Sequence, residues 1–239
     1  MITLLPLIVP VVGAALAALA GARRGAVTLV ALLSTLVAFV AALLLPGAAA
    51  IDAPWLPGVG VSFALDPGGA ASVLVVVVAL VMVPTALFAA LSVEERPGRF
   101  VAWLLLAQAG LAGIFMARDM VLFYVFWEGT LIPSLLLLGA YGLEKRRAAT
   151  LKYLTYAVGG SFVMLVSILA VKALSGAATF HVEDLVMAAR GLPAGTQAWL
   201  FAGLALGMVV KVPLWPLHSW LVDLNEQNHP SGAADVLGT

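Results

Sequence analysis

Apolar runs of about 20 residues recur along this sequence and constrain its fold more than any other feature. A helix needs about 20 apolar residues to cross a hydrocarbon core of roughly 30 Å, and helices or closed barrels satisfy all their backbone polar groups there. Charged residues make up 10% of the chain, against roughly 25% in soluble domains. We therefore expect an all-α, polytopic transmembrane helix bundle embedded in a lipid bilayer.

Seven complete spans can be assigned, six of them continuous and the seventh interrupted by prolines. An eighth apolar segment begins near Ser231, so we expect residues 1–239 to form a single transmembrane domain that is the N-terminal part of a longer subunit. The predicted spans are Leu4–Ala20, Ala26–Leu45, Ala70–Leu91, Phe100–Ala117, Met120–Leu138, Ala149–Leu174 and Ala198–Leu224.

Basic residues indicate how the chain is oriented. Lysine and arginine collect in cytoplasmic loops, and here they follow the first, third and fifth spans, around Arg23, Arg96 and Arg146. The N-terminus is therefore expected outside. On the outer side, Val59–Asp66 alternates like a short interfacial strand, and Phe180–Arg190 has the single apolar face typical of a helix lying on the membrane.

The seventh span is a broken helix that carries a charge. Lys211 lies within an apolar run, and Pro213 and Pro216 follow it before apolar sequence resumes at Leu214 and beyond. Proline lacks an N–H and disfavours helix in the preceding residue, so carbonyls near Lys211 should lose their partners. Such backbone is tolerated at membrane depth only where protein or water covers it. The alternative is a lysine at a helix end that snorkels to the surface.

Glu128 lies in the middle of the fifth span, too far from either end to snorkel. An acidic group at a helix centre costs about 2.5 to 3.5 kcal/mol on translocon scales, so it needs a partner, water or a proton. A protonated glutamate hydrogen-bonded to a neighbouring helix would be purely structural. If the Glu128 carboxylate lay about 4 Å from the Lys211 ammonium, the attraction between them would be about 4 kcal/mol with an effective dielectric of 20. We expect these two residues to form a proton relay, with His218 as a third candidate because imidazole titrates near neutral pH.

Simpler roles account for the other charged residues. Arg118 and Asp119 are adjacent in a tight hairpin, where a local ion pair is expected. Lys152 and Lys172 lie near opposite ends of the sixth span and can snorkel. His181 is expected to be a solvated interfacial residue.

Several function classes have no motif here. The chain has no cysteine, which excludes disulfides and thiolate-held iron–sulfur clusters or haem. It contains no GxGxxG after a strand, no Walker lysine and no HExxH, and its formal net charge of zero gives no indication of nucleic-acid binding. We expect no catalytic residue, cofactor or metal site in this chain.

Three segments resemble the antiporter-like membrane subunits of respiratory complex I, the proton-translocating NADH-quinone oxidoreductase, and most closely the M type. They are Phe126–Glu128, Lys211–Leu221 and His229–Asp235. The resemblance implies two inverted five-helix repeats, each with a broken helix, of which this chain would cover most of the first, after three preceding helices.

The resemblance also implies roles and partners. Glu128, Lys211 and His218 match proton-transfer residues of the family, and no redox centre or nucleotide site is expected in this chain. NADH, FMN, iron–sulfur clusters and quinone are expected in partner subunits of the complex, which would lie in the bacterial cytoplasmic membrane.

Three alternatives remain open. A subunit of a cation/proton antiporter or of a membrane-bound hydrogenase would share the same charged residues. An intramembrane hydrolase could hold a metal through His218, Asp223 and His229, although their spacing is not that of a metal site. A purely structural membrane module is the third alternative, and the central position of Glu128 argues against it.

Overall fold

The computed structural model describes residues 1–228, in which helices dominate and one small sheet interrupts them. The predicted start of an eighth span and His229 lie outside the described residues. The elements are α1 Leu5–Ala20, α2 Arg24–Leu43, β1 Ile51–Leu56, β2 Val61–Leu65, α3 Ala70–Ser92, α4 Pro97–Met116, α5 Met120–Tyr141, α6 Arg146–Ser175, α7 Val182–Ala189, α8 Ala194–Lys211 and α9 Ser219–Gln227, with 3-10 turns at Ile2–Leu4 and Pro57–Val59.

Within the described residues, six helices are long and apolar enough to cross a membrane, and they are α1 to α6. They coincide with the six continuous spans predicted from the sequence, which confirms the all-α transmembrane bundle. Pro133 does not interrupt α5, which continues for two further turns to Tyr141.

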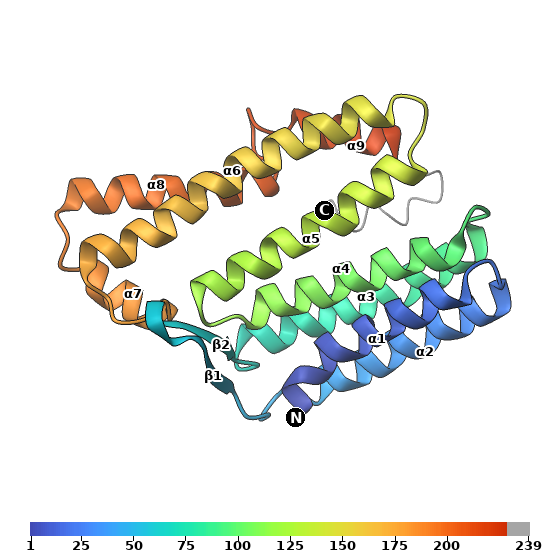
Figure 1. Cartoon of the computed structure of the whole chain (residues 1–239), viewed down its shortest axis with the longest axis horizontal. Helices are drawn as coiled ribbons and strands as arrows, with labels where there is room; N and C mark the ends of the chain where they lie inside the picture. The colour runs from blue at the N-terminus through green and yellow to red at the C-terminus, as the bar shows by residue number, and fades with distance from the viewer. Residues whose placement is uncertain (229–239) are drawn as a thin grey trace.

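The bundle has two groups of helices joined through α4 and α5 (Figure 1). In the first group α4 packs against both α1 and α3, and α2 packs against α1 and α3. Of the α4 span, 67% is buried, the largest share among the six, so α4 lies at the centre. In the second group α6 packs against α5, α8 and α9. Both halves of the broken helix, α8 and α9, therefore pack on α6, which in turn packs on α5.

The seventh span is broken, as predicted. The helix α8 ends at Lys211, residues 212–218 are not helical, and α9 begins at Ser219. Figure 1 shows α8 and α9 beside opposite stretches of α6, so that the break lies beside the middle of that helix. Helix resumes at Ser219, five residues after the apolar sequence does, because the two prolines and the residues they restrict keep the stretch between α8 and α9 out of helical geometry.

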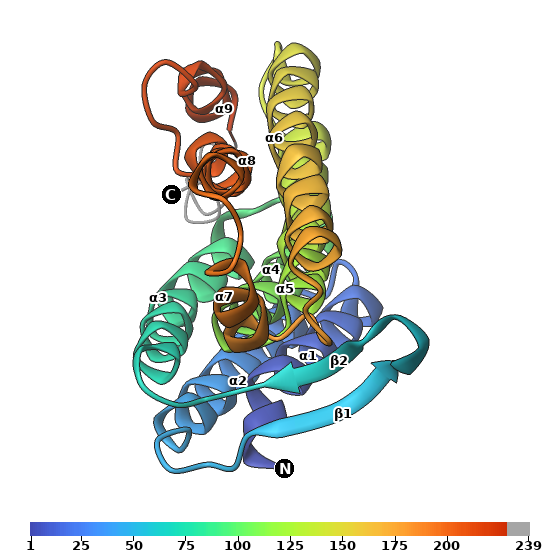
Figure 2. The same cartoon turned by 90° about the vertical axis from the view of Figure 1, so that its left-hand side faces the viewer.

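A β-hairpin and a short helix lie at one end of the bundle, on the left in Figure 1. The strand expected within Val59–Asp66 is β2, and the predicted amphipathic helix is α7. The partner strand β1 was not predicted, because Pro54 and the register shift beside it break the alternation. In Figure 2 the hairpin extends along the side of the bundle below α7.

Backbone hydrogen bonds join this hairpin to the turns between helices. Arg118 N donates to Ala64 O at 2.9 Å, Phe180 N to Gly60 O at 3.1 Å, and Met120 N to Phe180 O at 2.9 Å. The start of α5 is therefore fixed by two segments that are distant from it in the sequence, the hairpin and the chain around Phe180, which are themselves bonded to each other.

The expected local ion pair between Arg118 and Asp119 was wrong. Asp119 is fully buried and accepts hydrogen bonds from Val121 N at 2.8 Å and Leu122 N at 3.1 Å. Arg118 instead lies 3.1 Å from a carboxylate oxygen of Glu183 in α7. The free amides at the start of α5 need an acceptor, and a carboxylate at the N-cap supplies one.

Candidate functional site

Close packing of α8 on α6 sets the position of Lys211. A Cβ added at Gly207 would lie 2.6 Å from Met164 Cβ, and one added at Gly160 would lie 2.9 Å from Val210 Cβ. Only glycine allows the two helices to approach this closely, as small residues do at helix contacts in membranes. The end of α8 is thereby brought beside α5.

The Lys211 ammonium is held by α5. Its Nζ donates to Thr130 Oγ1 at 2.7 Å and to Trp127 O at 3.4 Å. It also lies 4.5 Å from the centre of the Trp127 ring, within the range of a cation–π interaction. These contacts are with the middle of a neighbouring span, so the snorkelling alternative for Lys211 is wrong.

The break frees backbone carbonyls, as predicted, and protein covers one of them. Pro213 has no N–H, and Leu214 N donates to Val209 O at 3.2 Å instead of to Val210 O. The indole N–H of Trp220 in α9 donates to Val210 O at 2.9 Å. Trp220 is buried and stacks on Tyr153 of α6, with 4.7 Å between ring centroids. The second half of the broken helix therefore supplies a hydrogen-bond donor to a free carbonyl at the end of the first half.

Glu128 and Lys211 face a common internal cavity rather than each other. The direct ion pair considered at 4 Å is not present: in residues 1–228 no cationic nitrogen lies within 4.0 Å of a Glu128 oxygen. Two of the three ammonium donors of Lys211 are directed to Thr130 and Trp127 instead. The cavity measures about 10 Å³, close to the minimum of roughly 10–15 Å³ for one water. Its other lining residues are Trp127, Leu131, Tyr153, Ala157, Gly207, Val210 and Trp220.

His218 is not among the residues that line this cavity. It directly precedes α9, and its Nδ1 is buried without a hydrogen-bond partner in the described part of the chain. The structure thus brings Glu128 and Lys211 together and leaves His218 in the non-helical segment beyond them.

A polar cluster between α6 and α9 was missed in the sequence. Lys152 Nζ lies 2.8 Å from Asp223 Oδ2 and donates to Ser219 O at 3.0 Å. The hydroxyls of Tyr156 and Ser219 are 3.3 Å apart. The assignment of Lys152 as a snorkelling residue was therefore wrong. The available signal was spacing, because residues 152 and 156, like 219 and 223, are four apart and share a helical face.

The remaining charged candidates have structural contacts. Lys172 Nζ donates to Ala178 O at 2.5 Å and lies 4.7 Å from the Phe180 ring centre. The His181 side chain is only 17% exposed, and its Nε2 lies 3.6 Å from Asp52 Oδ2. The expectation that His181 is solvated was wrong, because it packs between α7 and the hairpin.

The hydrolase alternative gains no support from the geometry. Asp223, one of its three ligands, is engaged by the Lys152 ammonium, and His229 lies outside the described residues. No group of three or more histidine, aspartate or glutamate side chains is placed to hold a metal in residues 1–228.

Comparison with known proteins identifies the family. A family model described as NADH:quinone oxidoreductase/Mrp antiporter, transmembrane, matches residues 117–234, which include Glu128, Lys211 and His218. NADH-quinone oxidoreductase subunit 13 of Thermus thermophilus is 42% identical over 190 residues, covering 80% of this chain and 39% of that protein. Subunit M of the enzyme from Rhodobacter capsulatus is 32% identical over 222 residues, covering 85% and 43%.

The fold agrees with these sequence relationships. A chain in the structure of respiratory complex I from Thermus thermophilus with bound NADH superposes with a TM-score of 0.89 at 38% identity, covering all of this chain and 50% of that one. The present chain thus spans less than half the length of these curated relatives. It belongs to the NADH:quinone oxidoreductase/Mrp antiporter transmembrane family and is similar to the M-type membrane subunits of complex I.

Proposed function

We propose that this chain is part of a proton-translocating membrane subunit of an NADH:quinone oxidoreductase. One observation carries the proposal: Lys211 ends a broken helix inside the bundle, is held by Thr130, and shares with Glu128 a cavity about the size of one water. A charge kept away from the surface at a helix break is costly. Such a charge is retained where it serves a function.

The chemistry of the relay is the transfer of single protons. In a low-dielectric interior the charged form of an ionisable group is costly, and a nearby opposite charge offsets that cost. When that opposite charge is neutralised or withdrawn, the Lys211 ammonium can release a proton to a water in the cavity and become an amine. Thr130 can then turn its hydroxyl to donate to the amine nitrogen, because a hydroxyl both donates and accepts. We assign His218 to the path beyond Lys211.

The energy for this cycle would come from other subunits. We propose that NADH oxidation and quinone reduction use FMN, iron–sulfur clusters and quinone held by partner subunits, with which this chain assembles in the membrane. The similarity to oxidoreductase subunits 13 and M supports this over a cation/proton antiporter. Residues 1–239 are proposed to form a single transmembrane domain.

The proposed location is the bacterial cytoplasmic membrane, with the N-terminus outside. Because residues 1–239 contain no native cysteine, single cysteines introduced at Arg23, Arg96 and Arg146 can be labelled without background from this part of the protein. All three should react with an impermeant maleimide only from the cytoplasmic side. Reaction of all three from the outside would reverse the orientation.

Proton uptake tests the function itself. The full-length subunit, assembled in its complex and reconstituted into vesicles, should lose most quinone-dependent proton uptake in the variants Glu128→Gln and Lys211→Met. The control Lys172→Met removes a lysine of α6 that contacts Ala178 O and does not line the cavity, and it should retain uptake. Normal uptake by Glu128→Gln in an assembled complex would refute the proposal.

A further inference from the structure

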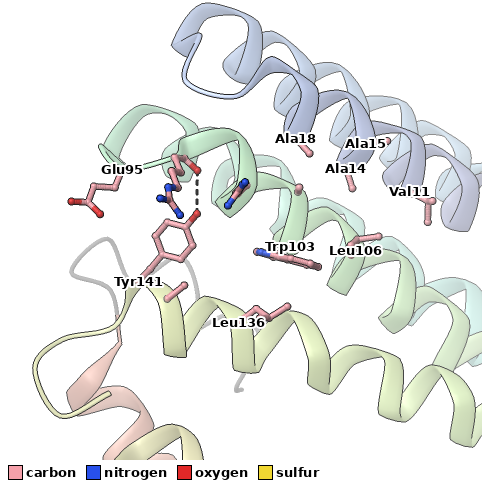
Figure 3. A pocket seen from close by; sticks show the side chains of 13 residues that line it. Val11, Ala14, Ala15, Ala18, Glu95, Trp103, Leu106, Leu136 and Tyr141 are labelled. Atoms are coloured by element: carbon pink, nitrogen blue, oxygen red, sulfur yellow. Dashed lines mark hydrogen bonds between the residues drawn. The ribbon is translucent and has the colours of Figure 1, made fainter. Parts of the chain in front are cut away.

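A groove of about 720 Å³ lies between α1, α4 and α5, within the range of roughly 300–1,000 Å³ typical of ligand pockets. Its lining residues from α1 are Val11, Ala14, Ala15 and Ala18, which share one helical face. Positions 11 to 18 span about 10 Å at 1.5 Å per residue. Figure 3 shows this face opposite Trp103, Leu106 and Leu136. This part of the groove is therefore apolar, and it is open because the α1 side chains that line it are small.

Two arginines lie at one end of the groove. Arg96 is the N-cap of α4 and Arg99 lies in its first turn, so both are placed where this span begins, at a membrane surface. The Arg96 backbone has a φ of 48°, and the Tyr141 hydroxyl donates to its carbonyl at 3.2 Å (Figure 3). This bond ties the arginine end of the groove to α5.

The two guanidinium groups at this end have no carboxylate partner among residues 1–228. In the described part of the chain, neither Arg96 nor Arg99 has a carboxylate within 4.0 Å of its guanidinium. Among residues 1–228, Glu95 is the single carboxylate that lines the groove, and in Figure 3 its side chain points away from the groove. The indole nitrogen of Trp103 lies on the side of the ring nearer Tyr141 (Figure 3). An occupant with anionic oxygens at this end and an apolar tail would match the groove.

We propose that this groove binds an anionic phospholipid, with the phosphate at Arg96 and Arg99 and an acyl chain along the α1 face. Basic pockets between helices at the membrane surface suit anionic lipid headgroups. Guanidinium groups also match phosphate geometry better than ammonium groups do. Such a site requires only that the turn between α3 and α4 lies at a membrane surface, so it is independent of the proposed proton relay.

The test uses the full-length subunit in its assembled complex, in vesicles of phosphatidylcholine that contain a trace of photoactivatable lipid. Two probes carry the same diazirine acyl chain, one on phosphatidylglycerol and one on phosphatidylcholine. Cross-linked peptides are then mapped by mass spectrometry. Phosphatidylglycerol should label the peptides containing Val11–Ala18 and Trp103 at least several-fold more than phosphatidylcholine does.

Charge variants separate a headgroup site from a general membrane contact. The double variant Arg96→Gln with Arg99→Gln should bring labelling by the two probes close to equal, because each basic side chain near an anionic surface contributes roughly 1 kcal/mol, or about fivefold in preference. The matched control Arg23→Gln with Arg24→Gln removes two arginines that do not line the groove and should keep the preference. Ala15→Trp fills the groove and should reduce labelling by both probes.

Three outcomes would overturn the proposal. The first is equal labelling of wild type by the two probes. The second is loss of the preference in the Arg23 and Arg24 control to the same degree as in the groove variant. The third is an absence of lipid labelling together with cross-links from a diazirine amino acid at Ala15 to a protein segment, which would identify the groove as a protein interface.

Discussion

Thr130 is predicted to hold the Lys211 ammonium in place, and Thr130→Val tests this with almost no change in side-chain shape. The substitution removes the hydroxyl that accepts from Lys211 Nζ at 2.7 Å. Hydrogen bonds to charged groups contribute about 1.5–3 kcal/mol. The other two contacts are weaker, since Trp127 O is 3.4 Å away and the Trp127 ring lies 4.5 Å from Nζ.

A loss of about 1.5–3 kcal/mol corresponds to a population change of roughly 10- to 150-fold. Proton uptake by the assembled complex should therefore fall at least about tenfold in Thr130→Val, if uptake requires the ammonium at this position. Thr130→Ser keeps the hydroxyl and should keep uptake within about twofold of wild type. Wild-type uptake by Thr130→Val would refute the reasoning, and an equal defect in Thr130→Ser would show that packing, not the hydroxyl, is responsible.

Three further predictions concern the packing and the ion pairs around this site. Gly207→Ala should destabilise the protein by about 1–3 kcal/mol in thermal unfolding, because the added Cβ would lie 2.6 Å from a side-chain atom of α6. Gly195→Ala is the control, because Gly195 lies in the same helix with open space around it, and this variant should leave stability unchanged. A double-mutant cycle of Lys152→Met and Asp223→Asn should give a coupling of about 0.2–1 kcal/mol, because these side chains are 33% and 43% exposed; a coupling indistinguishable from zero would contradict the ion pair. The Arg118 guanidinium lowers the pKa of Glu183 below its ordinary 4.5, so their pairing stabilises α7 above about pH 4.5 and is lost as the pH falls through the lowered pKa. Hydrogen exchange of α7 should therefore become faster over that acidic range in wild type. An equally large increase in Arg118→Gln would show that another group titrates.

The continuous spans could be predicted because a membrane leaves few alternatives. Long apolar runs must become helices at this depth, and the observed bounds of α1 to α6 differ from the predicted ones by a few residues. The differences lie at the polar ends, as at Tyr141, where the hydroxyl bonds to Arg96 O and the helix extends beyond the apolar run.

The candidate site could be predicted only in part. Glu128 and Lys211 stand out because a charge within an apolar run is costly, and both line one cavity. Their lack of direct contact could not be predicted, because it depends on Thr130, and a threonine in a helix carries almost no distinguishing signal. Lys152 was misassigned because its distance from the span end suggested snorkelling, while its partner Asp223 is 71 positions away in the chain.

The strand β1 and the role of Asp119 depend on contacts between distant segments. Asp119 caps its own helix, which is a local pattern, but its other oxygen also accepts from Ser62 N at 3.0 Å. Such pairings arise only when the hairpin is docked on the turn between α4 and α5.

The most direct measurement of the central claim is quinone-dependent proton uptake by Glu128→Gln, Lys211→Met and the double variant, each in an assembled complex. If the two residues act as one relay through their shared cavity, either substitution removes the same step. The double variant should then be no slower than the slower single variant, a large departure from additivity. Defects that multiply in the double variant would mean that Glu128 and Lys211 act independently and would contradict the relay.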